Sequence, residues 1–69
     1  MAQQTKNAIR RAFIQLLNER PLDKISIKDI AEKGAVNRNT FYYYYVDIYA
    51  LVEDILQLEI QDFQSKLRR

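Results

Sequence analysis

The chain has 69 residues, a formal net charge of +2, no cysteine and no histidine. This length suffices for one small domain, and the missing residue types exclude disulfides and the commonest metal, nucleophile and general-base sites. No apolar run approaches the ~20 residues that span a bilayer, and the N-terminal MAQQTKNAIRR lacks the apolar core of a signal peptide. We therefore expect a soluble, cytoplasmic protein that is not an enzyme and that needs no cofactor or metal.

The charge is unevenly distributed along the chain. Residues 1–46 carry eight Lys and Arg against four acids, a net charge of +4, whereas residues 47–69 carry three against five, a net charge of −2. The first two thirds can therefore face a polyanion such as a nucleic acid, and the last third cannot. An ordinary solvated surface explains the same numbers, because about a quarter of residues are charged in most soluble domains.

One glycine, one proline and no alternating strand pattern predict an all-helical chain. The first helix is expected from about Thr5, a good N-cap, to Glu19, and Pro21 stops it. Leu22 and Ile25 in the following link are expected to fill the core. The apolar stripe of this helix consists of Ala8, Ile9, Ala12, Phe13, Leu16 and Leu17.

Two short helices are predicted next. The first is expected to begin at Ser26, which forms a capping-box variant with Asp29, and to last about two turns. Gly34 follows it, where a left-handed residue is expected. Asn37 is the predicted N-cap of the next helix, which runs over roughly Arg38 to Tyr44. Two short helices joined by a tight turn containing glycine, after a longer support helix, describe a helix-turn-helix at about residues 26–45.

A fourth helix is expected from its N-cap, Asp47, to the end of the chain. Its apolar residues fall on two stripes: Ile48, Leu51, Ile55 and Leu58 on one face, and Leu56, Ile60, Phe63 and Leu67 on another. A small three-helix body cannot cover both stripes, so the second is expected to meet an absent domain or another copy. The sequence thus divides into a three-helix body, residues 1–46, and a connecting helix, residues 47–69.

The third helix of such a motif can enter the major groove of DNA with its N-terminal residues at the base edges. The exposed candidates are Asn37, Arg38, Asn39 and Thr40. Asparagine pairs with adenine and arginine with guanine, while threonine bonds to phosphate or touches a thymine methyl. The alternatives are that Asn37 only caps the helix and that Arg38 is only solvated.

Five consecutive aromatic residues, Phe41 to Tyr45, go all round one short helix and cannot all lie in the core. Phe41 and Tyr45 share a face and are expected to anchor the helix inward. Tyr42 is predicted to donate a hydrogen bond to a phosphate oxygen. Tyr43 and Tyr44 either do the same, or they cover apolar surface or meet a partner domain.

The starts of two helices supply further candidate phosphate contacts. Lys24, Ser26 and Lys28 surround the start of the second helix, where free N–H groups and positive charge attract an anion. Lys6 is placed similarly in the first helix. For any one of these lysines, a surface residue without a partner is the simpler interpretation.

At these residues the chain resembles the tetracycline-repressor (TetR) family of transcriptional regulators. The resemblance covers about residues 5–55, and the Thr-Phe-Tyr sequence followed by an aromatic pair and a new helix cap is its most specific part. The matching positions are residues 27–33, residues 36–42, Tyr44, Tyr45, Asp47 and Leu51, together with Thr5, Ile9, Ala12 and Leu16 of the first helix.

The resemblance implies a three-helix bundle with a helix-turn-helix, followed by a long fourth helix. It implies a homodimer that binds double-stranded DNA sequence-specifically at a palindromic operator. Such a protein is usually a repressor, which a small effector molecule releases from the DNA. Thr40 and its neighbours then meet the major groove and Tyr42 meets a phosphate, at the bacterial nucleoid. The C-terminal domain that binds the effector and dimerises is missing from the chain. The rival hypothesis is a TetR-like protein-interaction module that has lost DNA binding.

Three positions depart from the family's pattern. Gly34-Ala35 reverses the usual Ala-Gly turn, so the left-handed position is expected to shift or to cost stability. Ile48 replaces a common lysine after the fourth-helix cap, which removes a phosphate contact. Tyr49 replaces the usual acid beside it.

Overall fold

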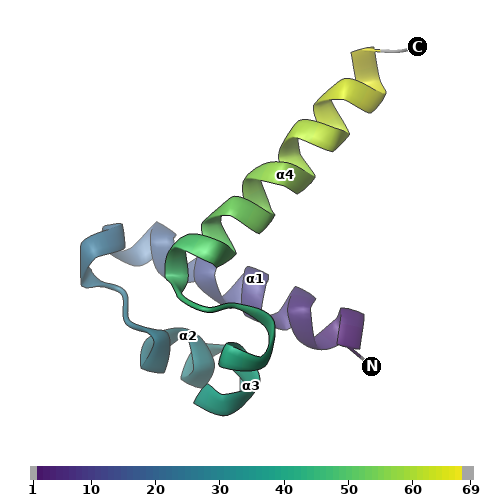
Figure 1. Ribbon diagram of the computed structural model, residues 1–69. Coiled ribbons are helices and arrows are strands. Elements are labelled where there is room, and N and C mark those ends of the chain that lie inside the picture. Colours follow the sequence, from purple (N-terminus) through teal and green to yellow (C-terminus); the bar gives the residue numbers. More distant parts are fainter. Residues whose placement is uncertain (1, 68–69) are drawn as a thin grey trace.

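The computed structural model describes residues 2–67, which form four α-helices and one short 3-10 helix, with no strand in that range (Figure 1). The predicted fold, a three-helix bundle with a helix-turn-helix and a long fourth helix, is confirmed. The elements in chain order are α1 (Ala2–Glu19), η1 (Leu22–Lys24), α2 (Ile27–Lys33), α3 (Arg38–Tyr44) and α4 (Ile48–Leu67).

The first helix and its link differ from the prediction at two places. α1 begins at Ala2 and not at Thr5, because the glutamines between them are good helix formers and nothing interrupts them. The link contains an unpredicted 3-10 turn, in which the Lys24 N–H donates to the Pro21 carbonyl at 2.9 Å. Ile25 is buried as expected, but this turn leaves Leu22 39% exposed. The expectation that Leu22 fills the core is therefore wrong.

The start of α2 is fixed by a complete capping box. The Ser26 hydroxyl accepts from the Asp29 N–H at 3.0 Å, and the Asp29 carboxylate accepts from the Ser26 N–H at 3.0 Å. These hydrogen bonds, more than the nearby Arg20, hold the pKa of Asp29 below its usual value. Arg20 also donates to the same carboxylate at 3.2 Å, which ties the end of α1 to α2. The predicted cap is confirmed.

The core lies where α1, α2, α3 and the first half of α4 meet. Ile9, Ile30, Phe41 and Leu51 are its largest fully buried side chains, one from each α-helix. Burial of the apolar surface of each of these side chains stabilises the fold by roughly 1.5–3 kcal/mol. The rest of the buried apolar set consists of Ala12, Phe13, Leu16, Ile25, Ala31 and Tyr45.

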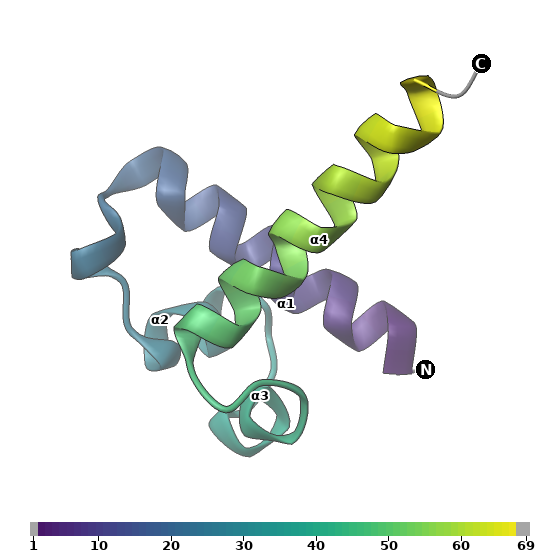
Figure 2. The ribbon, with the colours of Figure 1, turned by 45° about the horizontal axis from the view of Figure 1, so that its top comes forward.

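The second half of α4 leaves the body. α4 crosses α1 and then projects away from the other helices (Figures 1 and 2). Every residue from Leu56 to Leu67 is exposed. Leu58, expected on the inward stripe, is 44% exposed and lines an open groove with Arg10 and Ile14 of α1. The second stripe, Leu56, Ile60, Phe63 and Leu67, is exposed as the sequence indicates.

The turn between α2 and α3 is a Schellman motif whose left-handed residue is Ala35. The Val36 N–H donates to the Ala31 carbonyl at 2.9 Å and the Ala35 N–H to the Glu32 carbonyl at 3.2 Å. Ala35 has φ 58°, whereas Gly34 has φ −86°. The expectation that Gly34 is left-handed is therefore wrong by one position.

Gly34 instead lies where the turn closely approaches α1. A Cβ atom at this position would lie 3.3 Å from the carbonyl oxygen of Ile30, 3.4 Å from that of Ala8 and 3.5 Å from the Cβ of Ala12. The turn therefore sits directly against α1. An alanine at this position would therefore need its neighbours to give by a few tenths of an ångström.

A polar network joins α1, the end of α3 and α4. The Asp54 carboxylate accepts from Arg10 at 2.9 Å and from the hydroxyl of Tyr45, the C-cap of α3, at 2.5 Å. Arg10 also donates to the Tyr45 hydroxyl at 3.4 Å and to Asn7. Lys6 completes the group, with its ammonium 3.9 Å from the Asp54 carboxylate and 5.6 Å from the centre of the Tyr45 ring.

The network shifts the pKa values of Tyr45 and Asp54 in opposite directions. Burial, followed by the hydrogen bond to Asp54, raises the pKa of Tyr45 from 10.0 to about 12. The hydrogen bond from Tyr45, together with that from Arg10, lowers the pKa of Asp54 and outweighs the effect of its partial burial. The native state therefore favours a neutral tyrosine beside an ionised aspartate.

We expect Ala35→Gly to raise the free energy of unfolding by about 0.5–1 kcal/mol, because glycine adopts a positive φ without a steric penalty. Gly34→Ala should lower it, because the added Cβ meets the backbone of Ile30 and Ala8. Urea unfolding followed by circular dichroism measures both. An Ala35→Gly variant no more stable than the parent chain would contradict the strain assigned to this turn.

Stability should also fall at both ends of the pH range. The lowered pKa of Asp54 contributes stability above its unfolded pKa, and this is lost as the pH falls through the folded value. The raised pKa of Tyr45 contributes stability below pH 10.0, and this is lost as the pH rises toward about 12. Urea unfolding across the pH range measures both effects. In Tyr45→Phe the alkaline loss should shrink, and a loss of unchanged size would rule out this assignment.

Candidate nucleic-acid interface

The N-terminus of α3 is held by Asn37. Its side-chain oxygen accepts from the Thr40 N–H at 2.8 Å and from the Thr40 hydroxyl at 3.1 Å. The predicted N-cap is therefore confirmed. Because this oxygen accepts both hydrogen bonds from Thr40, capping is a sufficient role for the Asn37 side chain in the protein without DNA.

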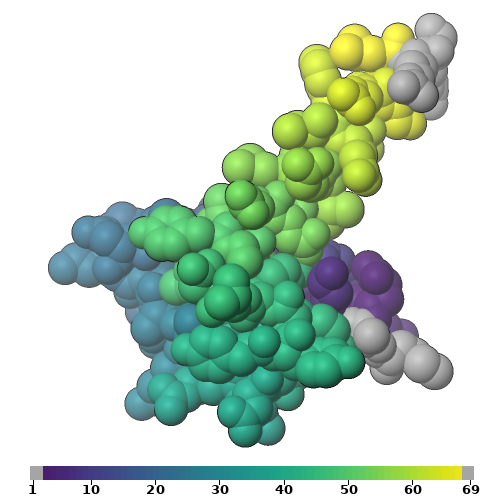
Figure 3. All heavy atoms as spheres, in the orientation of Figure 1, coloured from purple at the N-terminus to yellow at the C-terminus, as the bar shows by residue number. Residues whose placement is uncertain are grey.

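The four candidate base-reading residues lie together at this end of α3. Asn37, Arg38 and Asn39 are exposed, and Thr40 is half-buried. α3 occupies the outer surface of the body on the side away from the free end of α4, as the space-filling view shows (Figure 3). This end of α3 is therefore accessible to a large partner.

The aromatic run divides as its helical spacing predicts. Phe41 and Tyr45 are buried, and they anchor α3 from behind as expected. Tyr42 is 53% exposed and Tyr43 is 81% exposed, so both hydroxyls can meet a ligand. Tyr44 is half-buried and packs against the core, and its ring stands nearly perpendicular to that of Tyr43 with the ring centres 4.9 Å apart. Tyr44 therefore covers apolar surface with its ring.

The candidate phosphate site at the start of α2 is partly occupied by the protein itself. Lys24, Ser26 and Lys28 are all exposed there, as expected. However, the Ser26 hydroxyl and the Asp29 carboxylate are both engaged in the capping box. A carboxylate at this position repels a phosphate, so the two lysines, and not the helix terminus, are the attractive groups.

The ion pairs separate the basic residues into two groups. Lys6, Arg10, Arg20, Lys33 and Lys66 each form a salt bridge. Within residues 2–67 the cations without a salt bridge are Arg11, Lys24, Lys28 and Arg38. Three of these four lie from η1 to α3, where Asp23 and Glu32 also form no salt bridge, so the charges outside ion pairs in this stretch come to a net +1.

Lys6 lies apart from the other candidates. Its ammonium is held between Asp54 and the Tyr45 ring, near the end of α3 and not near α2. Any phosphate contact by Lys6 would therefore occur beside the tyrosines.

The Arg10–Tyr45–Asp54 network is the feature near this surface that the sequence did not reveal. Tyr45 lies 35 positions from Arg10 along the chain, and Asp54 lies 44 positions from it. A signal did exist, because Asp54 follows the buried Leu51 by three positions and so shares its helix face. Arg10 likewise adjoins Ile9 at the edge of the apolar stripe of α1.

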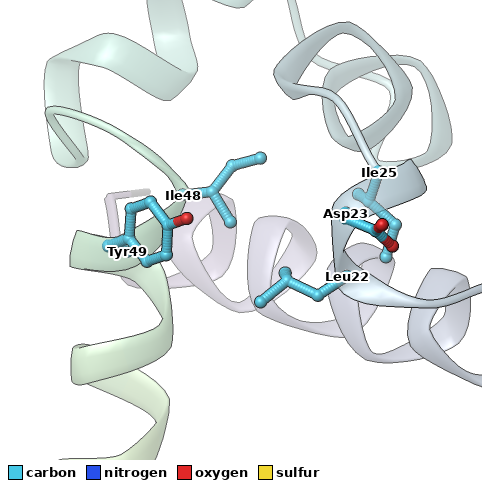
Figure 4. Close-up of a pocket in the computed structure, with 5 residues that line it drawn as sticks. All are labelled: Leu22, Asp23, Ile25, Ile48 and Tyr49. Atoms are coloured by element: carbon cyan, nitrogen blue, oxygen red, sulfur yellow. The ribbon is translucent and has the colours of Figure 1, made fainter.

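A shallow apolar groove of about 610 Å³ lies between η1 and the start of α4. Figure 4 shows Ile48 and Tyr49 of α4 facing Leu22, Asp23 and Ile25 across it. Ile48 is half-buried against the core and Tyr49 is 72% exposed. Ile48 therefore serves packing.

No group of three or more acidic, histidine or cysteine side chains within residues 2–67 is placed to hold a metal ion. None of the helices in this range is long and apolar enough to cross a membrane.

Comparison with known proteins agrees with this geometry. The family of bacterial regulatory proteins named tetR matches residues 9–55, which include α2, the turn and α3. The uncharacterized HTH-type transcriptional regulator YxbF of Bacillus subtilis (strain 168) is 33% identical over 57 residues, covering 83% of this chain. A second uncharacterized HTH-type regulator of that organism, YvdT, is 39% identical over 63 residues, covering 86% of the chain.

The chain spans 15% of the length of YxbF and 32% of that of YvdT. No solved structure shows a significant match to it. The family match covers most of the chain, including both helices of the helix-turn-helix. The chain therefore belongs to the tetR family of bacterial regulatory proteins.

Proposed function

We propose that this chain is the DNA-binding part of a transcriptional regulator and that it binds double-stranded DNA with α3 in the major groove. The observation that carries this proposal is that α3 has one buried face and one exposed face. Phe41 and Tyr45 bury one face of the helix, while Arg38, Asn39 and Tyr43 are exposed. A short helix anchored in this way can enter a groove without losing its attachment to the body.

The proposed contacts sort into two kinds. Arg38, Asn39, Thr40 and, through its amide group, Asn37 meet base edges, because they lie at the N-terminus of α3. Tyr42 donates to a phosphate, and Tyr43 extends this contact along the backbone. Tyr44 contributes at most its hydroxyl, since its ring packs on the core. Lys24 and Lys28 attract the phosphates at the start of α2, the Ser26 hydroxyl donates its own hydrogen to one of them while it caps the helix, and Lys6 adds a contact beside the tyrosines.

The remainder of the regulator is proposed from α4 and from the lengths of the relatives. In this proposal residues 1–46 form the DNA-binding body and residues 47–69 connect it to a second domain, which packs on the exposed stripe of Leu56, Ile60, Phe63 and Leu67. That domain dimerises and binds a small effector. The homodimer binds a palindromic operator at the nucleoid in the cytoplasm and represses until the effector releases it.

A salt titration tests DNA binding against the rival hypothesis of a protein-interaction module. Contacts with phosphates make the logarithm of the affinity for duplex DNA fall linearly with the logarithm of salt concentration, by about 0.9 per contact. Lys28→Gln should reduce this slope by about one contact. The matched control Lys66→Gln lies in the last turn of α4, where it pairs with Asp62, and should leave the slope unchanged. Equal slopes in both variants would exclude the proposed docking side.

A double variant tests the assigned face of α3. Thr40→Ala combined with Tyr42→Phe removes two hydroxyls and should lower the affinity for duplex DNA by about tenfold, because each lost hydrogen bond is worth about 0.5–1.5 kcal/mol. Fluorescence anisotropy with a labelled duplex measures this. Circular dichroism should show an unchanged helix content. Full affinity in a folded double variant would refute the assignment.

A further inference from the structure

The end of α3 is attached to the body by a directional contact. Tyr45 packs its ring on Phe41, with the ring centres 5.7 Å apart at an angle of 48°. Its hydroxyl reaches Asp54 of α4 at 2.5 Å and Arg10 of α1 at 3.4 Å. One side chain therefore links α3 to both long helices.

Apolar packing alone leaves the orientation of α3 poorly defined. Among residues 38–44 only Phe41 is buried, and attraction between apolar surfaces has no preferred direction. A hydrogen bond, by contrast, has strict requirements for distance and angle, and bonds to an ionised carboxylate are among the stronger ones. The hydroxyl of Tyr45 can therefore fix the rotation of α3 about Phe41.

Arg10 supports the contact between Tyr45 and Asp54 from the side of α1. Arg10 is 9% exposed, although arginine is rarely buried without a partner. It bonds to Asn7, Tyr45 and Asp54 together. No buried side-chain nitrogen or oxygen within residues 2–67 lacks a hydrogen-bond partner. A fully satisfied polar group of this kind defines one arrangement of the elements that it joins.

We propose that Arg10, Tyr45 and Asp54 are positioning residues for DNA recognition, which hold α3 at the angle at which its N-terminal residues reach the base edges while Tyr42 reaches a phosphate. The inference rests on the proposed function, since it assigns these three residues to the same surface. It predicts that their loss affects the discrimination between DNA sequences more than the attraction to DNA in general.

The charge of Asp54 makes this proposal sharply testable. Asp54→Asn removes a negative charge, and by charge alone this would strengthen binding to any polyanion. Positioning predicts the opposite result for a specific duplex. Glu53→Gln is the matched control, because it removes the same charge from the adjacent, exposed residue of α4 and leaves the network intact. Tyr45→Phe removes only the hydroxyl and changes no charge at neutral pH.

The experiment begins with selection of a duplex from a random-sequence pool by the parent chain. The affinity of each variant is then measured for this duplex and for an unselected random-sequence duplex. The ratio of the two affinities is the readout, because a lower folded fraction reduces both equally and leaves the ratio unchanged. A role limited to stability therefore cannot alter it.

We expect the ratio to fall about tenfold in Asp54→Asn and about threefold in Tyr45→Phe, as for the loss of roughly 1.4 and 0.7 kcal/mol. It should not change in Glu53→Gln. Unchanged ratios in both network variants would overturn the inference. If Asp54→Asn does not fold, because Arg10 is left without its carboxylate, Tyr45→Phe alone decides. A parent chain that binds neither duplex would refute the proposed function itself, which is a different outcome.

Discussion

The structure depends on the meeting of four apolar side chains, one from each α-helix. Ile9, Ile30, Phe41 and Leu51 are fully buried together, and no helix can leave this centre without exposing one of them. α2 and α3 have seven residues each, which is too short for a helix to persist alone in water. The surface that would meet DNA therefore exists only while the core is closed, and folding and formation of this surface are one event.

The parts of the fold that the sequence predicts are those fixed by neighbours along the chain. The caps at Ser26 and Asn37 bond to residues three positions ahead, so their patterns are visible in the sequence. Such local patterns do not predict which residue of the turn between α2 and α3 takes the positive φ. It follows from the end of α2, where Gly34 is the C-cap and the hydrogen bonds of Ala35 and Val36 leave the positive φ to Ala35.

The same distinction applies to the candidate site. Helical spacing alone predicts that Phe41 and Tyr45 face inward, and therefore that Tyr42 and Tyr43 face outward. It does not predict the partners of the Tyr45 hydroxyl, which come from α1 and α4. Nor does it predict that Lys6 lies against Asp54, because the crossing of α1 and α4 is set by packing of the whole core. Long-range polar contacts need the three-dimensional arrangement before they can be recognised.

The bond between Thr40 and Asn37 limits what Thr40 can offer to nucleic acid. A threonine side chain has a single hydroxyl hydrogen, and here the hydroxyl donates it to the side-chain oxygen of Asn37, with the two oxygens 3.1 Å apart. Toward the outside Thr40 then shows only lone pairs and a methyl group. Phosphate oxygens are also acceptors, so they would find no hydrogen there. In the proposed complex Thr40 is thus suited to an exocyclic amino group of adenine or cytosine, or to a thymine methyl, and the capping bond itself narrows the bases that this position can favour.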